Sequence, residues 1–111
     1  MGRILAWGVR GPPRRGSAMV VGTLRVTLSL DGAQSLKEKR RIVQSLVRRL
    51  HNEFPVSVSE VADHDVWTRA TLGVACVTND GRHADRVLAQ VVRYLERERE
   101  AYLVDYEVEI R

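Results

Sequence analysis

The residues of this sequence that could do chemistry are cations gathered in one short run. The stretch Ser35–Arg41 reads SLKEKRR, and four of its seven side chains are positively charged. Ammonium and guanidinium groups bind phosphate oxygens, so such a run is typical of contacts with a nucleic-acid backbone. Lys37 falls in the expected first turn of a helix, where the macrodipole makes positive charge unfavourable by about 0.3–1 kcal/mol. The run therefore favours a binding surface, because a surface selected for stability would carry acids there.

On a helical wheel, these cations fall on two sides of an apolar stripe. One row of polar residues follows spacings of three and four on the face turned away from the stripe, and it contains no acid: Lys37, Arg41, Gln44, Arg48 and Asn52. Arg40 flanks the stripe and Lys39 falls almost within it, so we expect both to extend past the sheet end and form an anion pocket. The predicted nucleic-acid contacts are Lys37, Lys39, Arg40, Arg41, Gln44 and Arg48. An ordinary solvated helix face is the alternative.

A second group of candidate ligands is the acidic stretch Asp63, His64 and Asp65. Three consecutive residues on one loop do not readily face one ion, and no other motif supplies further ligands, so we predict no metal site. With Trp67, the same residues form a candidate interaction loop for a protein partner. Asp31 occupies a position where a small nuclease could hold an acid, but Asp31-Gly32 is first a turn signal. We predict no catalytic residue, cofactor or small-molecule substrate.

The net charge of the chain comes from its first 18 residues. The formal charge is +4, and residues 1–18 contain four arginines and no acid. Residues 19–111 hold 14 Lys+Arg and 14 Asp+Glu, so they sum to zero. Since residues 1–18 are rich in Gly, Pro and Arg, we expect a disordered extension, either dispensable or a basic nucleic-acid-binding arm. Global charge is thus weak evidence about partners.

Hydrophobic periodicity predicts two helices and four strands in residues 19–111. A helix is expected over about 36–53, with Ser35 and Glu38 as a capping box and Pro55 as its stop. A second helix has the apolar stripe Ala84, Val87, Leu88, Val91 and Leu95. Period-two alternation marks strands at residues 23–30, from 56, at 70–76 and at 102–110. In the last strand, Tyr102, Val104, Tyr106, Val108 and Ile110 alternate with Leu103, Asp105, Glu107 and Glu109, and we expect the first set to face the core.

The element order is β-α-β-β-α-β, which indicates one domain over residues 19–111. Right-handed crossovers favour an α+β ferredoxin-like fold, in which a four-stranded antiparallel sheet carries both helices on one face. The single cysteine excludes an intrachain disulfide, and no apolar run is long enough to span a bilayer. We therefore expect a reduced, cytoplasmic protein without membrane association.

The uncovered face of the predicted sheet restricts how RNA could bind. Its two central strands should present Thr23, Arg25, Thr27, Ser29, Arg69, Thr71, Gly73 and Ala75. No aromatic side chain is among them, so base stacking on the sheet is disfavoured, and contact through the backbone and shape of RNA is expected instead. The same weakly charged face could pack against a second copy of the chain, which makes a homodimer an alternative.

Three stretches resemble the YlxP-like family, the domain of unknown function 503. They are SLKEKRR at 35–41, NEFPVSVSEV at 52–61 and the W-x-R-A-x-L-G stretch at 67–73, and the resemblance covers nearly all of residues 19–111. It implies a small bacterial cytosolic protein of ferredoxin-like fold, from a family often encoded beside translation and ribosome-maturation factors. It implies no activity and no catalytic residues.

These observations predict a non-enzymatic binding protein that associates with ribosomal RNA or a ribosome-assembly particle through its basic first helix. A homo-oligomeric protein-interaction module is the alternative, and a metal-dependent nuclease is the third possibility.

Overall fold

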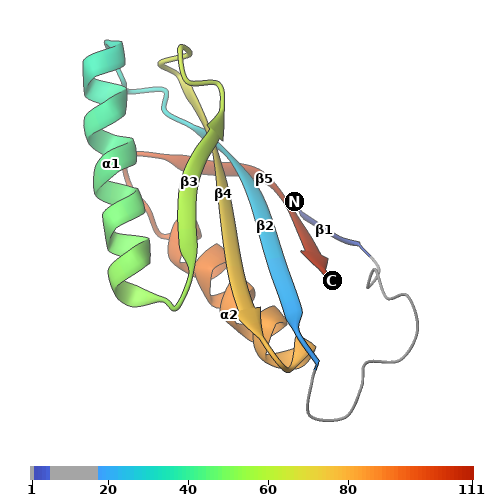
Figure 1. Cartoon of the computed structure of the whole chain (residues 1–111). Helices are drawn as coiled ribbons and strands as arrows, with labels where there is room; N and C mark the ends of the chain where they lie inside the picture. Colours follow the sequence, from blue (N-terminus) through green and yellow to red (C-terminus); the bar gives the residue numbers. More distant parts are fainter. Residues whose placement is uncertain (1, 6–17) are drawn as a thin grey trace.

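The order of helices and strands is the predicted one, with one further strand at the start. The computed structural model describes residues 2–5 and 18–111 (Figure 1). Its elements are β1 (Gly2–Leu5), β2 (Val20–Ser29), α1 (Leu36–Glu53), β3 (Ser57–Ala62), β4 (Arg69–Thr78), α2 (Gly81–Glu96) and β5 (Tyr102–Ile110). From β2 onward this is β-α-β-β-α-β. The sheet order is β1-β5-β2-β4-β3, and β2, β3, β4 and β5 pair antiparallel, so the fold is α+β and ferredoxin-like, as the periodicity indicates.

The strand β1 has no counterpart among the predicted elements. It runs parallel to β5, with Gly2 opposite Tyr106 and Leu5 opposite Glu109. Without it, β5 would be an edge strand with unpaired backbone groups, which readily accept another strand. Residues 2–5 of the basic extension are therefore part of the sheet. Disorder was expected for the whole extension, but residues 1 and 6–17 lie outside the described residues.

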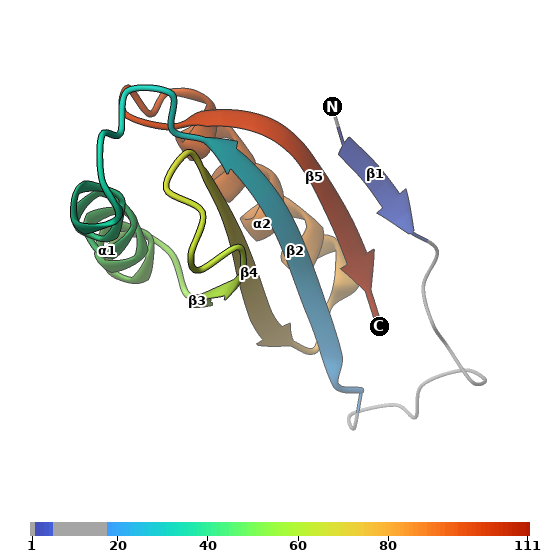
Figure 2. The ribbon, with the colours of Figure 1, turned by 90° about the horizontal axis from the view of Figure 1, so that it is seen from above.

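Both helices cover the same face of the sheet. α2 packs on β2, β4 and β5, whereas α1 packs beside β3 at the end of the sheet opposite β1 (Figures 1 and 2). The core between these layers runs from Val20 to Ile110 and includes four of the five predicted stripe residues of α2, and the fifth, Val87, is also buried. At Gly22 the sheet and α2 approach so closely that a Cβ atom would lie 3.0 Å from both Ala84 and Leu88 side-chain atoms.

The helix boundaries follow the capping signals. The Ser35 hydroxyl accepts the Glu38 backbone N–H at 3.0 Å, and α1 ends at Glu53, two residues before Pro55. The Asp80 carboxylate accepts the Arg82 backbone N–H at 2.9 Å and starts α2. Helix α1 therefore occupies the residues predicted for it, which fixes the orientation of its polar side chains.

The start of β5 departs from the predicted alternation. A bulge between Thr27 and Leu28 shifts the pairing of β2 with β5, so that Leu28 faces Leu103 and Ser29 faces Tyr102. Leu103 packs on the core, whereas Tyr102 is 63% exposed and Val104 is also exposed. The predicted inward direction of Tyr102 and Val104 is wrong, because one extra residue in a strand reverses the faces of those beyond it.

Candidate functional site

The outer face of α1 holds most of the predicted nucleic-acid contacts. The side chains of Lys37, Arg40, Arg41, Gln44 and Arg48 are all exposed. Lys37, Arg40 and Arg48 form no ion pair with any described residue. These three cations, together with Gln44, make up what we call the α1 basic face.

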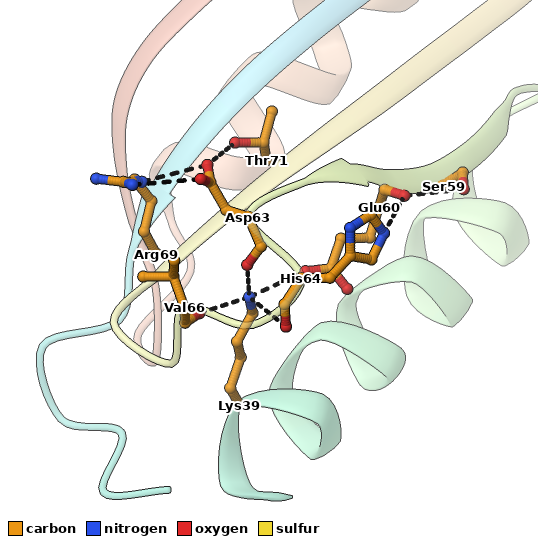
Figure 3. A network of polar contacts seen from close by, with 8 residues as sticks. All are labelled: Lys39, Ser59, Glu60, Asp63, His64, Val66, Arg69 and Thr71. Atoms are coloured by element: carbon orange, nitrogen blue, oxygen red, sulfur yellow. Dashed lines mark hydrogen bonds and ion pairs between the residues drawn. The ribbon is translucent and has the colours of Figure 1, made fainter. Parts of the chain in front are cut away.

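Lys39 does not belong to this face, contrary to the sequence-based interpretation. Its side chain is 1% exposed and points inward between α1 and the β3–β4 loop (Figure 3). The ammonium donates hydrogen bonds to the backbone carbonyls of Asp63 at 2.5 Å and Val66 at 2.6 Å, and it lies 3.0 Å from the Glu60 carboxylate. Because its donors are engaged inside the protein, Lys39 has none to offer a phosphate, and the predicted anion pocket with Arg40 is not formed.

Arg41 is exposed, but it has an acidic partner that the helical wheel did not reveal. Its guanidinium donates to the Glu100 carboxylate at 3.0 Å, from the segment between α2 and β5. The hydrogen bond and the charge of Glu100 raise the pKa of Arg41. The polar row of α1 therefore contains no acid of its own, but Glu100 neutralises the charge of Arg41 in the folded protein.

The predicted interaction loop is folded around Asp63. This residue has the left-handed φ of 63°, which Asp tolerates better than most side chains. Its carboxylate accepts hydrogen bonds from Thr71 at 2.6 Å and Arg69 at 3.2 Å, and these bonds lower the pKa of Asp63 (Figure 3). The His64 ring contacts the Glu60 carbonyl at 3.2 Å instead.

The loop residues thus point in different directions. Asp65 is exposed, and Trp67 is 48% exposed. Of the predicted loop surface, Asp63 is committed to holding the loop, whereas His64, Asp65 and Trp67 are accessible to a partner.

The described residues contain no group of three His, Cys, Asp or Glu side chains that could hold a metal ion. The Asp31 carboxylate accepts the Ser29 hydroxyl at 2.6 Å, which is a contact within the turn. Burial raises the pKa of the Cys76 thiol, which lies in the core. A thiol in this environment is a poor nucleophile.

A groove lies between α1 and the outer edge of β3, next to the α1 basic face. Its volume is about 500 Å³, and we call it the α1–β3 groove. Val43 and Val47 of α1 and Val58 of β3 contribute apolar surface. Gln44, Arg48 and His51 line its helix side, and Ser59 and Glu60 its strand side. Sequence reasoning found Gln44 and Arg48 but not the groove, since nothing in the sequence shows that α1 stands beside β3.

The uncovered face of the sheet is hollowed as well. The register places Thr23 opposite Ala75 and Arg25 opposite Gly73, as predicted for this face. A hollow of about 470 Å³ lies over Thr23, Gly73 and Ala75, and its lining also includes Arg25, Glu107 and Glu109 of β5, and Arg111. Glu109 forms an ion pair with Arg111.

Comparison with known proteins identifies the family. Residues 21–108 match the family described as "Protein of unknown function (DUF503)". This chain belongs to that family. A relative in Bacillus subtilis (strain 168), "Uncharacterized protein YlxP", is 34% identical over 77 residues, which cover 69% of this chain and 84% of the relative.

The matched DUF503 region includes α1, the β3–β4 loop and the α1–β3 groove. Within the described residues, neither helix is long and apolar enough to cross a membrane.

The acids that determine which cations of α1 are available were not predicted from the sequence. Glu60 and Glu100 lie 21 and 59 residues from their partners Lys39 and Arg41. One signal was present: Lys39 sits within the apolar stripe of α1, and a lysine at a buried position requires a partner.

Proposed function

We propose that this protein is a non-enzymatic binding protein that contacts ribosomal RNA, or a ribosome-assembly particle, through the α1 basic face. The observation that carries the proposal is that Lys37, Arg40 and Arg48 are exposed on one helix without an acidic partner among the described residues. Other cations of the same helix do have partners: Lys39, Arg41 and Arg49. Unpaired cations in a row favour phosphate binding.

The contact is expected to read the shape and backbone of RNA. The α1 basic face holds cations and an amide but no aromatic side chain on which a base could stack. The middle of the uncovered sheet face also has none. Ribosomal RNA is the favoured partner because the family resemblance implies genes beside translation and ribosome-maturation factors, and such a partner places the protein in the cytoplasm.

The test is the salt dependence of binding to ribosomal RNA. If about three phosphates are contacted, the slope of log affinity against log salt should be about −2 to −3. Replacing Lys37, Arg40 and Arg48 together by Glu should abolish most of the binding and co-sedimentation with ribosomal particles.

The matched control is replacement of Arg82, Arg86 and Arg93 by Glu, since these are three exposed arginines on α2. It changes the net charge equally but leaves the α1 basic face intact. Equal loss of binding in both triple variants would show that only net charge matters, and would contradict a role for α1.

Self-association is a second candidate, favoured by the uncovered sheet face. Val77 is 70% exposed, Val61 is also exposed, and a hollow lies between β3 and β5 on the same side. Exposed apolar side chains around a hollow suit a second copy of the chain. Sedimentation velocity should then show a dimer that Val77→Glu dissociates, and a wild-type monomer at high concentration would exclude this candidate.

A further inference from the structure

β3 has a free backbone edge, because it is the last of the described strands in the sheet. The Glu60 carbonyl is contacted by the His64 ring, so it points away from β4. Backbone directions alternate along an antiparallel strand, and the N–H and C=O of Val58, two residues earlier, therefore point outward too. β3 thus presents a donor and an acceptor at the mouth of the α1–β3 groove.

The side chains around this edge define what could lie beside it. Val43, Val47 and Val58 offer apolar surface, and Arg48 stands on the opposite wall. Arg40 lies one turn before Gln44 on the same helix. Glu60 is the only acid among the described lining residues, and its carboxylate is engaged by Lys39. The groove is therefore apolar at its base and positively charged along its helix side.

We propose that the α1–β3 groove binds an extended acidic peptide of a partner protein, which pairs with β3 as an added strand. The backbone of the peptide bonds to the outward groups of Val58, and its alternate side chains pack against the valines. Acidic side chains on the peptide reach Arg48 and Arg40. The site shares Arg40, Gln44 and Arg48 with the α1 basic face but not Lys37, and it extends over the flank of α1 that faces β3.

A second copy of this chain is a poorer occupant of the groove. Two β3 edges paired about a two-fold axis would place both α1 helices on the same side of one continuous sheet. Each helix would bring Arg40 and Arg48 toward the other, and like charges in contact oppose association. Charge complementarity favours an acidic strand from a different protein.

The test is selection of a phage-displayed random dodecapeptide library against the full chain. The selected peptides should alternate Asp or Glu with Val or Ile. A synthetic peptide of that sequence should slow amide hydrogen exchange at Val58 and Glu60. Arg48→Glu should weaken its binding at least about tenfold. Lys37→Glu, in the first turn of α1 and outside the groove lining, and Arg86→Glu, on α2, should leave it unchanged.

Several results would overturn the proposal. One is that no peptide is selected, and another is that the selected peptides have no preference for acidic residues. A third is that the peptide slows amide hydrogen exchange at Gly73 and Ala75 of the uncovered sheet face and not at the β3 edge. Protection of the Val58 and Glu60 amides by single-stranded poly(U) but by no peptide would assign the groove to RNA. Loss of peptide binding and loss of RNA binding are separable, because Lys37→Glu affects only the latter.

Discussion

The Lys39 ammonium lies 3.0 Å from the Glu60 carboxylate and joins α1 to β3 inside the protein. It also holds the β3–β4 loop through the carbonyls of Asp63 and Val66. Lys39→Met should therefore destabilise the protein by about 2–4 kcal/mol, because it leaves Glu60 without its partner and the two loop carbonyls without this donor. Urea denaturation monitored by circular dichroism measures this change.

The control is Lys37→Met, two residues away and exposed, which should change stability by less than about 0.5 kcal/mol. Adding Glu60→Gln to Lys39→Met should restore part of the lost stability, since no buried charge then remains unpaired. If Lys39→Met were as stable as Lys37→Met, the network in Figure 3 would not bear on folding.

The contact of α2 with β2 depends on a missing side chain at Gly22. A Cβ there would lie 3.0 Å from side-chain atoms of Ala84 and Leu88, which is tighter than most packed contacts, so these side chains would have to shift by a few tenths of an ångström. Gly22→Ala should thus cost about 1–3 kcal/mol of unfolding free energy. Gly32→Ala is the matched control, because nothing lies within 4 Å of its Cβ position and the change should be neutral. Thermal denaturation of both variants measures the difference. Similar melting temperatures would contradict a close approach of α2 to β2 at Gly22.

How far the sequence predicts this fold depends on whether the signals are local. The Ser35 cap, the Pro55 stop and the stripe of α1 act within a few residues, and the helix has the predicted bounds. The candidate site was predicted less well, because the availability of a cation depends on distant acids. Glu100 lies 59 residues from Arg41, between α2 and β5, so only the fold brings the two side chains together. The strand β1 was not predicted either, since it forms by pairing with the edge of β5.

The bulge in the pairing of β2 with β5 is the clearest nonlocal effect. Period-two alternation assigns Tyr102 to the core, but the shift at Thr27 and Leu28 exchanges its place with that of Leu103. Leu103→Ala should therefore cost about 2 kcal/mol, and Tyr102→Ala less than about 1 kcal/mol. Chemical denaturation of the two single variants gives the comparison. A larger loss of unfolding free energy for Tyr102→Ala than for Leu103→Ala would show that Tyr102 packs in the core, as simple alternation predicts.

Stability should depend on pH through Glu98, which follows the end of α2 and pairs with Arg49 of α1 at 2.9 Å. Burial opposes the charge of Glu98, but hydrogen bonds from Arg49 and the Glu100 backbone N–H outweigh it and lower the pKa. A lowered pKa contributes stability that is present above the ordinary glutamate pKa of about 4.3 and is lost as pH falls through the folded value.

Glu98→Gln should consequently cost about 1–2 kcal/mol at pH 7 and progressively less below about pH 4. Arg49→Gln, which removes the charged guanidinium, should show the same trend. Urea denaturation at several pH values gives the difference between each variant and the wild type. A difference that stays constant from pH 7 to pH 3 would show that the ionised carboxylate is not what stabilises the contact.

The ion pair between Arg41 and Glu100 should limit binding of RNA to the α1 basic face. Both side chains are largely exposed, so the pair contributes little to stability, and Glu100→Gln should leave folding unchanged. The substitution frees Arg41 beside Lys37, which adds a phosphate contact and should make the salt slope of ribosomal RNA binding steeper by about 0.7–0.9. Glu96→Gln removes the same charge from an exposed position on α2 and controls for net charge. Filter binding across a salt series gives both slopes. If the two variants bind RNA equally, Arg41 lies outside the contact, and the surface reduces to Lys37, Arg40, Gln44 and Arg48.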